Sequence, residues 1–467
     1  MSFRIPLDEL KKHQETTKLK KLLTLMSSPK KKFSRAGGKF QTYEKKTVVN
    51  MYMVENGILY IPYTFAKVYF SDNKFFSSYL KVDEKPQLFP EGKKGKFKGN
   101  LREYQVDVYT EAKEILKIHK TITLALYPSF GKTFLGSIFS WFLNSYTVIL
   151  VHREVIAQAW EKTYKSFLLL EEGSVIMVDD KMNKPDKKSG ICPVEKGKIF
   201  ICMYSRWKKI PVYVREKIKL LIVDEAHTFC TPDKVESLLF LNPKYVIAMT
   251  ATRERVDDGL EIVIETICGK QSIERFSEKK FKFYIVDTDL DFKIEGHANK
   301  FGELVEKQSK SLERNSMILS LVKKHTHFKT MIIGKRKEHC NFLKDCLERE
   351  KIECETLFGT KKKCRTKNIL IGTDSKMGTG FDESNACIDY DDVPSELLFM
   401  LHSYAKWSTF EQVIGRGKRS KNPKVVMFLD KNRTTKNHFR EIRKWVKESN
   451  GEIIDVKKED IEKISIF

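Results

Sequence analysis

An apolar run that ends in two acids, LLIVDEAHTF at residues 220–229, constrains the fold more than any other stretch of the chain. Four apolar residues lead straight into Asp224 and Glu225, a pattern that predicts a strand buried on both faces of a parallel α/β sheet. Ligands bind such sheets at the carboxyl ends of the strands. Asp224 there could hold Mg²⁺, and Glu225 could orient or deprotonate an attacking water. Taken alone, DEAH is also compatible with acids at the start of a helix.

A phosphate-binding turn lies about 90 residues upstream of the two acids. Residues 121–143 read as an apolar strand, a turn that ends in Gly-Lys-Thr at 131–133, and an apolar helix. Amides at a helix N-terminus bind phosphate, the Lys reaches the β- and γ-phosphates, and the Thr hydroxyl ligates Mg²⁺. The turn departs from the usual pattern, since Leu126 replaces its first Gly and Pro128-Ser129 precede its end. Together, the two stretches predict one nucleotide site.

A second α/β series follows the first and has no phosphate loop of its own. This arrangement suggests a site between two similar domains. Arg416 and Arg419 of QVIGRGKR lie three residues apart, so we expect them on one face of a helix. Guanidinium groups stabilise charge on a transferring γ-phosphoryl group, which favours an arginine-finger role. The alternative is a basic helix that contacts nucleic acid or faces solvent.

The chain is strongly basic, with a formal net charge of +24 and a pI of about 9.4. Residues 1–100 hold 21 Lys and Arg against 9 Asp and Glu, a net +12 and therefore half of the excess. Such a charge favours a polyanionic partner, by default nucleic acid, although general Lys enrichment of the source genome is the alternative. The nine cysteines form no CxxC pair and are odd in number, which indicates reduced thiols in a cytoplasmic protein.

No targeting or membrane segment is expected. Residues 4–21 are charged throughout, which excludes a signal peptide there, and the apolar stretch 134–151 is interrupted by Ser and Asn. We therefore expect a soluble monomer without membrane contact.

The pattern predicts four segments: a basic, β-rich accessory domain at 1–97, α/β units at 98–285 and 286–435, and a charged helix and tail at 436–467. Within them, we expect an amphipathic helix over residues 1–30 and a hairpin at Asn56-Gly57. The basic stretch 30–40, with its interleaved Phe, could follow a phosphate backbone or simply be a flexible loop. We also expect residues 281–292 to form a strand that leaves the first α/β unit, and residues 386–394 a further strand and turn.

Between residues 101 and 430 the chain resembles the superfamily 2 DEAH-box helicases and translocases. The order LREYQ, PSFGKT, VHREVIAQAW, DEAH, TAT, GTDSKMGTGFD, QVIGRGKR is similar to their motifs Q, I, Ia, II, III, V and VI. The resemblance implies two tandem RecA-like P-loop domains with parallel sheets, an α/β fold. It also implies ATP and Mg²⁺ as cofactors, DNA or RNA as partner, and nucleic-acid-dependent ATP hydrolysis.

Two stretches narrow the resemblance to the XPB/UvsW-like branch. LREYQ and TATRERVDDGLE are similar to motifs of that branch, the latter to TATPxRxDG with Arg253 in place of Pro and one extra residue. The Ile-Pro pair at 61–62 and the short length resemble helicases of large cytoplasmic DNA viruses, such as the poxvirus transcript-release helicase. That likeness implies work in viral transcription, in the host cytoplasm or virion, with transcription machinery as a partner.

The resemblance also assigns roles to residues that match the motifs. Nucleotide binding falls to Gln105, which would read adenine, and to Ser129, Phe130, Gly131, Lys132, Thr133, Gly380 and Asp382. Thr133 and Asp224 would hold Mg²⁺. The catalytic set is Glu225, Gln412, Arg416 and Arg419. His227, Thr250 and Thr252 would couple hydrolysis to strand movement, and Arg153 and Ser205 would contact the nucleic-acid backbone.

Three other functions remain open at this stage. One is the motor subunit of a restriction-type nuclease, although no nuclease signature of paired acids and Lys is evident outside 101–430. Another is a binding protein with a dead ATP site, which the altered phosphate loop suggests. The third is a catalytically weak nucleic-acid-binding clamp, or a subunit of a transcription complex.

Overall fold

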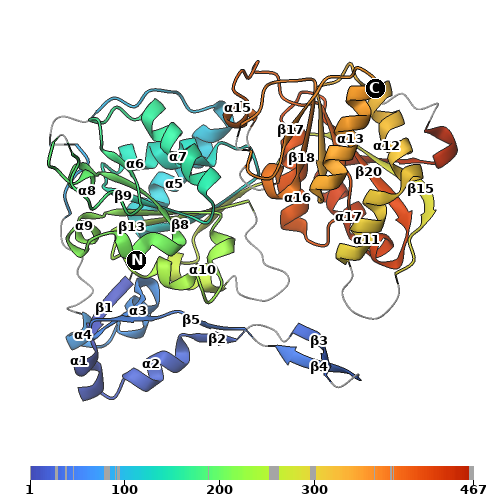
Figure 1. Ribbon diagram of the computed structural model, residues 1–467. Helices are drawn as coiled ribbons and strands as arrows, with labels where there is room; N and C mark the ends of the chain where they lie inside the picture. Colours follow the sequence, from blue (N-terminus) through green and yellow to red (C-terminus); the bar gives the residue numbers. More distant parts are fainter. Residues whose placement is uncertain are drawn as a thin grey trace. The chain divides into compact units, whose positions relative to one another are not determined.

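The computed structural model describes residues 2–26, 30–36, 39–45, 47–77, 85–89, 91, 95–187, 189–251, 262–294, 301–361, 363–378, 381 and 383–461. The chain forms two compact units, Met1–Leu126 with Phe130–Arg275, and Tyr127–Ser129 with Phe276–Phe467. Each unit is built around a seven-stranded sheet with helices on both faces (Figure 1). None of the helices in the described part of the chain is long and apolar enough to cross a membrane.

The sheet of the first unit is parallel throughout, as the apolar strands predicted. Its order is β10 (Val175–Met177), β11 (Ile199–Met203), β9 (Thr147–Val151), β12 (Leu220–Asp224), β13 (Tyr245–Thr250), β8 (Thr121–Leu126) and β14 (Ser272–Arg275). Around it lie α5 (Glu103–His119), α6 (Lys132–Phe142), α7 (Glu154–Phe167), α8 (Pro193–Lys196), α9 (Val212–Lys217) and α10 (Ile262–Cys268). Every residue of β8, β9 and β12 is buried, which explains their nearly continuous apolar sequence.

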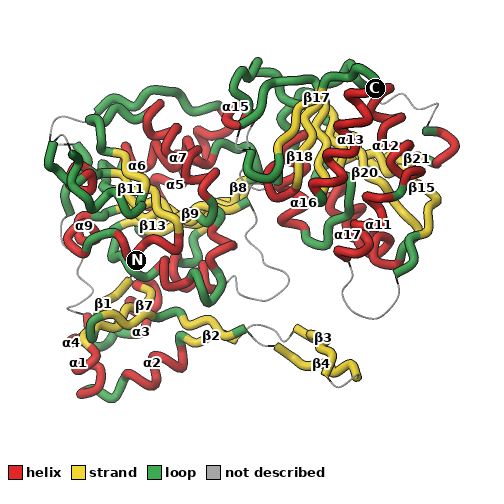
Figure 2. The backbone as a smooth tube through the Cα atoms, viewed as in Figure 1, coloured by secondary structure: helices red, strands yellow, loops and turns green. Residues whose placement is uncertain are grey.

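The sheet of the second unit is also parallel. Its strands are drawn in yellow in Figure 2. Its order is β17 (Cys354–Leu357), β18 (Ile369–Thr373), β16 (Thr330–Gly334), β19 (Leu397–Met400), β20 (Lys424–Lys431), β15 (Phe281–Asp291) and β21 (Gly451–Val456). Its helices are α11 (Phe301–Lys310), α12 (Leu312–Lys324), α13 (Lys337–Arg349), α14 (Asp374–Met377), α15 (Glu383–Ala386), α16 (Trp407–Gly417) and α17 (Arg433–Glu448). The predicted α/β class with two tandem parallel sheets is confirmed.

Three predictions about the second unit are wrong in detail. β15, expected to leave the first unit, lies between β20 and β21 in the second sheet. The stretch expected to be a charged tail supplies β21, an edge strand. Residues 386–394 contribute only a bridge, Cys387 to Cys364, and the strand of this region is β19 instead. Asp389, Asp391 and Asp392 disfavour a strand there, because acids are depleted in sheets.

The N-terminal segment begins with a strand where we expected a helix. β1 (Ser2–Pro6) pairs with β7 (Ile58–Pro62), and α1 (Leu7–Lys12) and α2 (Thr16–Leu22) follow it. Phe3 and Ile5 are buried in the core, so packing stabilises β1. The charged residues that follow in the sequence made this strand look like part of a helix. The hairpin at Asn56-Gly57 is confirmed: both residues have positive φ and join β6 (Met53–Glu55) to β7. Two short helices follow, α3 (Tyr63–Tyr69) and α4 (Lys74–Ser77).

The remaining N-terminal strands form two antiparallel pairs. β2 (Thr24–Met26) pairs with β5 (Val48–Asn50), and β3 (Lys30–Ala36) pairs with β4 (Lys39–Lys45). Residues 30–36 and 39–40 of the basic stretch therefore lie in paired strands, which differs from the flexible-loop alternative.

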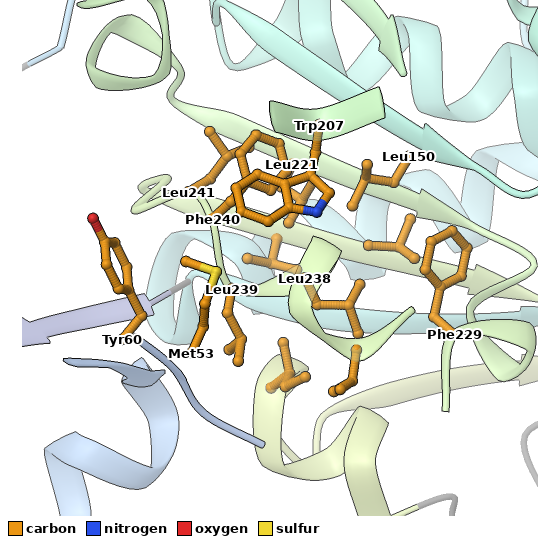
Figure 3. Close-up of a cluster of buried hydrophobic side chains, with 14 of the residues drawn as sticks. Met53, Tyr60, Leu150, Trp207, Leu221, Phe229, Leu238, Leu239, Phe240 and Leu241 are labelled. Carbon is orange, nitrogen blue, oxygen red and sulfur yellow. The ribbon is translucent and has the colours of Figure 1, made fainter. Parts of the chain in front are cut away.

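The N-terminal elements share one hydrophobic core with the first α/β sheet. Figure 3 shows Met53 and Tyr60 beside Leu238, Leu239, Phe240 and Leu241. The amide and hydroxyl of Ser2 both donate to the carbonyl of Leu241, at 3.0 and 2.6 Å. Buried Arg215 pairs with Glu55 and lies over the Trp207 ring. The N-terminal segment is thus part of the first compact unit, while the expected domain boundaries stay predictions.

Candidate functional site

Polar residues gather at the carboxyl edge of the first sheet, because parallel strands end on the same side. The loop 127–131 follows β8, His152-Arg153 follow β9, and residues 204–209 form a 3₁₀ turn after β11. Asp224 is the last residue of β12 and Thr250 the last of β13, the strand next to it. Stretches spread over more than 120 residues of sequence are therefore brought to one edge, where ligands of such sheets bind.

The loop between β8 and α6 turns sharply onto the helix N-terminus. Ser129 and Gly131 have φ of 71° and 92°, in the left-handed region. A Cβ atom at Gly131 would lie 2.5 Å from Gln105 Nε2, so glycine is required there by both conformation and space. Lys132 is the first residue of α6, and its Nζ donates to the Leu126 carbonyl at 2.9 Å. Thr133 follows it, in the first turn of the helix.

Gln105 braces this loop from α5. Its Nε2 donates to the carbonyl of Phe130 at 2.7 Å, and its Oε1 accepts from the amide of Arg102 at 2.9 Å. Both Gln105 and Phe130 are buried. The structure thus gives Gln105 a definite contact with the phosphate-type turn, and its role as adenine reader stays a prediction.

Asp224 is buried at the end of β12 and holds a carboxylate in an apolar setting. Its Oδ2 accepts from the indole N–H of Trp160 at 2.7 Å, and its Oδ1 from the amide of Glu225 at 3.0 Å. Burial, together with the neighbouring Glu225 carboxylate, raises the pKa of Asp224 above its ordinary value. A cation at this carboxylate would offset that cost, which fits the chemistry of a Mg²⁺ ligand.

Glu225 stands on a strained backbone directly after the strand. Its φ of 52° is left-handed, a conformation that costs a non-glycine residue about 1–3 kcal/mol and clusters at functional sites. Within the described part of the chain, its buried Oε2 accepts no hydrogen bond, and His227 Nδ1 lies 3.6 Å away. The side chain therefore presents a carboxylate oxygen that can accept a hydrogen bond from a water.

The His of DEAH is tied to the neighbouring strand. His227 Nδ1 and Thr250 Oγ1 are 2.8 Å apart, and Thr250 is fully buried at the end of β13. The structure thus joins two of the three residues predicted to couple hydrolysis to movement. The third, Thr252, lies outside the described residues.

The residues predicted to contact a strand backbone flank this centre. Arg153 is the half-buried residue before α7, and Ser205 is exposed on the 3₁₀ turn after β11. His152, between β9 and Arg153, lies in the polar turn that the sequence indicates at this strand end, but no role was predicted for it. Burial, and next the charge of Arg153, lowers the pKa of His152 to about 3, so the imidazole is neutral at ordinary pH. Its buried Nδ1 has no hydrogen-bond partner among the described residues.

In the second unit, the residues of QVIGRGKR lie on and just beyond α16. Gln412 and Arg416 are buried, and Arg416 donates through Nε and Nη2 to the carbonyl of Gly378 at 3.2 and 2.9 Å. The prediction of one shared helix face is wrong for Arg419, because α16 ends at Gly417 and Arg419 follows on a turn. Gly380 and Asp382 lie outside the described residues.

Trp160 was missed by sequence reasoning, although it holds Asp224. The two residues are 64 positions apart, and VHREVIAQAW marks Trp160 only as an apolar helix position. No pattern within the chain could have revealed this contact.

Comparison with known proteins finds similar sequences. Residues 98–255 match the family model described as "Type III restriction enzyme, res subunit". The chain is 28% identical over 383 residues to "Putative helicase 161L" of Invertebrate iridescent virus 6, covering 76% of this chain and 83% of the relative. It is 29% identical over 208 residues to "Putative helicase 109L" of Invertebrate iridescent virus 3, covering 44% and 60%.

Among solved structures, S. cerevisiae Dbp5 bound to RNA and ADP BeF3 has a similar fold. The TM-score is 0.53 at 14% identity, over 76% of this chain and 90% of Dbp5. At that identity the likeness concerns the fold alone, and it agrees with two tandem RecA-like domains. The family match and the viral relatives, taken with this fold, support a superfamily 2 helicase.

Proposed function

We propose that the chain is an ATP-dependent nucleic-acid helicase or translocase of the DEAH type. The observation that carries the proposal is the convergence at one sheet edge of three features. These are Lys132 at the start of α6, the buried carboxylate of Asp224, and a Glu225 oxygen without a hydrogen-bond partner among the described residues. A nucleotide phosphate, its counter-ion and an attacking water need such groups together.

Each residue then has a distinct task. The amides at the start of α6 and the Lys132 ammonium bind the β- and γ-phosphates, and Glu225 Oε2 orients the water and takes its proton. Thr133 and Asp224 would hold Mg²⁺, which supplies charge neutralisation at the phosphates when bound. The donor set fits that ion, because both groups offer oxygen ligands and the buried Asp224 carboxylate gains from a nearby cation.

The second unit would complete the site when ATP is bound. Gln412, Arg416 and Arg419 would stabilise charge on the γ-phosphoryl group, and Gly380 and Asp382 would line the nucleotide. Hydrolysis would then depend on both units, which converts each turnover into a change in their relative position. The proposed boundaries are 98–285 and 286–435 for the two RecA-like domains, after an accessory segment at 1–97 and before a C-terminal segment at 436–467.

Nucleic acid would lie along the carboxyl edge of the first sheet. Arg153 and Ser205 would contact its backbone, and the hydrogen bond of His227 to Thr250, with Thr252 beyond it, would relay the state of the nucleotide. The formal charge of +24 supports a polyanionic partner. The Dbp5 structure, which contains RNA and ADP BeF3, supports the same pair of ligand classes for this fold. The sequence resemblance leads us to propose further that the chain is a monomer of the XPB/UvsW-like branch that acts in viral transcription, and the viral relatives, which are putative helicases, support the helicase part of this proposal.

Hydrolysis measured with and without nucleic acid tests this proposal. Glu225→Gln is expected to retain ATP binding and lose turnover, because the amide cannot take the proton. Normal hydrolysis by that variant would refute the assignment of the base.

A weak ATPase that acts as a nucleic-acid clamp is the second candidate. The observation in its favour is the altered loop, in which Leu126 supplies the carbonyl that Lys132 Nζ contacts. A clamp would bind nucleic acid equally well with Lys132→Ala, whereas a motor would lose its stimulated hydrolysis. A restriction-type motor, which the description of the matching family model names, is a further alternative and would require cleavage of duplex DNA by this chain or a partner.

A further inference from the structure

The buried acid Asp224 receives a hydrogen bond from Trp160, a residue of α7 for which no role was expected. We propose that Trp160 is a positioning residue, whose indole N–H fixes the orientation of the Asp224 carboxylate so that a divalent cation can bind it. The inference rests on the proposed function, in which Asp224 is a Mg²⁺ ligand, and adds to it a residue that acts through Asp224.

Two donors hold the carboxylate, one on each oxygen. Trp160 Nε1 donates to Oδ2 at 2.7 Å, and the Glu225 amide donates to Oδ1 at 3.0 Å. An ionised carboxylate offers about four lone-pair sites, so about two remain for a cation. Because a donor on each oxygen opposes rotation about the Cβ–Cγ bond, the remaining lone pairs point in fixed directions. Loss of such a hydrogen bond to a ligating group typically lowers metal affinity or activity by about 10- to 100-fold.

The indole ring packs at a point where α6 carries a glycine. Trp160 is fully buried, and a Cβ atom at Gly136 would lie 2.4 Å from its Cη2 and 2.9 Å from Met249 Cε. Gly136 belongs to α6, the helix that begins with Lys132. A glycine inside a helix costs stability relative to alanine. Here it leaves the space in which the indole packs against the helix that follows the phosphate-type turn.

A buried polar network fixes α7 against its neighbours. Trp160 and Tyr164 are one turn apart on α7, with ring centroids 5.9 Å apart. The Tyr164 hydroxyl lies 2.6 Å from Ser140 Oγ of α6, and Thr147 Oγ1 of β9 donates to Ser140 Oγ at 3.2 Å. All three hydroxyl-bearing residues are buried. Because α7 is tied in this way to α6 and β9, the indole N–H is held in position before a ligand binds, as a positioning group requires.

A buried indole N–H needs an acceptor in any protein, so the contact could serve the fold alone. Trp141 of the same unit shows that simpler solution, since its Nε1 donates to the carbonyl of Gly95. Trp160 donates instead to a buried carboxylate, whose ionisation in an apolar setting costs stability. This acceptor is explained if the carboxylate binds a cation and the indole orients it for that task.

A matched pair of full-length variants tests the proposal. Trp160→Phe removes the N–H and keeps an aromatic ring, whereas the control, Tyr164→Phe, removes a buried hydroxyl one turn away on the same helix. Mn²⁺ is the probe, because it shares the preference of Mg²⁺ for oxygen ligands. Its binding to each protein with a non-hydrolysable ATP analogue is measured by EPR of the free ion, with the analogue alone as the blank. Thermal melting confirms that both variants fold, and hydrolysis is then titrated with Mg²⁺.

Trp160→Phe is expected to weaken Mn²⁺ binding by about 10- to 100-fold, because the carboxylate loses the donor that orients it. The Mg²⁺ concentration for half-maximal hydrolysis should rise by a similar factor, while kcat at saturating Mg²⁺ should fall less. Tyr164→Phe should leave both the Mn²⁺ affinity and the Mg²⁺ requirement unchanged, although it loses a buried hydrogen bond.

Gly136→Ala provides a second perturbation, which keeps the N–H but forces the indole ring to shift. It should weaken Mn²⁺ binding as well, and it provides the test if Trp160→Phe does not fold. Mn²⁺ affinities of Trp160→Phe and Gly136→Ala that equal the affinity of Tyr164→Phe would overturn the proposal.

The inference about Trp160 can fail alone or together with the proposed function. If the unsubstituted protein hydrolyses ATP and binds Mn²⁺ with the analogue, but Trp160→Phe has the affinity of the control, then Trp160 is only structural. If the unsubstituted protein neither hydrolyses ATP nor binds Mn²⁺ with the analogue, the proposed function is wrong as well.

Discussion

The carboxyl edges of the two sheets differ in how their acids are satisfied. In the second unit, Asp430 is fully buried and accepts hydrogen bonds from Arg314, Gln308 and Thr288. Asp374 accepts from His402 at 2.7 Å and from Tyr404 at 2.7 Å.

The acids at the carboxyl edge of the first sheet accept fewer hydrogen bonds. Asp224 receives one indole N–H and one amide, and the Oε2 of Glu225 has no hydrogen-bond partner among the described residues.

This difference distinguishes acids that stabilise the fold through internal hydrogen bonds from acids that keep the capacity to bind a ligand. The second edge neutralises its charges internally, through contacts such as the ion pair of Arg314 with Asp430. The first edge keeps a strained Glu225 and a buried Asp224, both of which cost stability. A protein retains such costs where the groups act on a substrate. This difference supports our proposal that the site of hydrolysis lies at the carboxyl edge of the first sheet.

The largest expected effect is on turnover. Glu225→Gln should lower nucleic-acid-stimulated kcat by at least about 10³-fold, since removal of a base that acts in the transition state costs several kcal/mol. ATP affinity, measured by a fluorescent analogue, should change little. Glu383→Gln, a buried acid of the second unit that contacts Ser395, is the control and should lower kcat far less. Comparable losses in both variants would remove the distinction between the two edges.

The second effect is on folding. Asp430→Asn leaves Arg314 buried without its counter-ion and should destabilise the second unit by about 3–5 kcal/mol, measured by denaturant unfolding. Asp455→Asn breaks the exposed pair with Arg443 in the same unit and should change little. If Asp430→Asn is as mild as its control, the buried network does not hold the fold.

A third test compares two acids whose pKa values move in opposite directions. Burial and Glu225 raise the pKa of Asp224, so its ionisation costs stability as pH rises from about 4 through the raised value. Asp224→Asn should therefore stabilise the protein by about 1 kcal/mol at pH 8 while hydrolysis is lost. The gain should vanish below pH 4.

For Asp374, burial acts to raise the pKa, but His402 and Tyr404 outweigh it and lower the value. Its ionised form then stabilises the fold above the ordinary pKa, and this contribution is lost as pH falls through the lowered one. Asp374→Asn should accordingly destabilise at pH 8. Melting curves measured across a range of pH give the sign of the stability change for each of the two variants. The same sign for Asp224→Asn and Asp374→Asn would contradict the proposed difference between the two sheet edges.

The smallest effect concerns coupling. Thr250→Val removes the hydroxyl that His227 contacts and should lower the ratio of stimulated to basal hydrolysis by about tenfold. Thr250→Ser keeps the hydroxyl and should restore most of that ratio. A ratio unaffected by Thr250→Val would mean that the contact is only structural.

Much of this arrangement could be predicted because local pattern and tertiary role agree. The strands at 121–126 and 220–224 are apolar runs that end in functional residues, and both were found by sequence alone. The DEAH box and the Gly-Lys-Thr turn each follow one of these strands, so the sequence also predicts that both belong to one nucleotide site. Such strands can be recognised from the sequence alone. Because they are buried on both faces, nearly all of their residues are apolar, and apolar and polar residues do not alternate.

What could not be predicted depends on contacts distant in sequence. β1 and β21 join sheets whose other strands lie far away, and their charged surroundings resemble helix or tail. The end of α16 at Gly417 places Arg419 beyond the helix, which spacing alone cannot reveal. Trp160 donates a hydrogen bond to Asp224, which lies 64 positions away in the sequence. Arg314 donates to Asp430, which lies 116 positions away.

ATP hydrolysis by the purified protein, measured alone and with single-stranded DNA, duplex DNA or RNA, tests whether the first sheet edge is the site of a nucleic-acid-dependent ATPase. Lys132→Ala serves as the control. We predict strong stimulation by one of these polymers and its loss in the variant, which would establish the motor and identify its track. Absence of hydrolysis under every condition, or hydrolysis that survives Lys132→Ala, would contradict the assignment of this edge and favour the clamp.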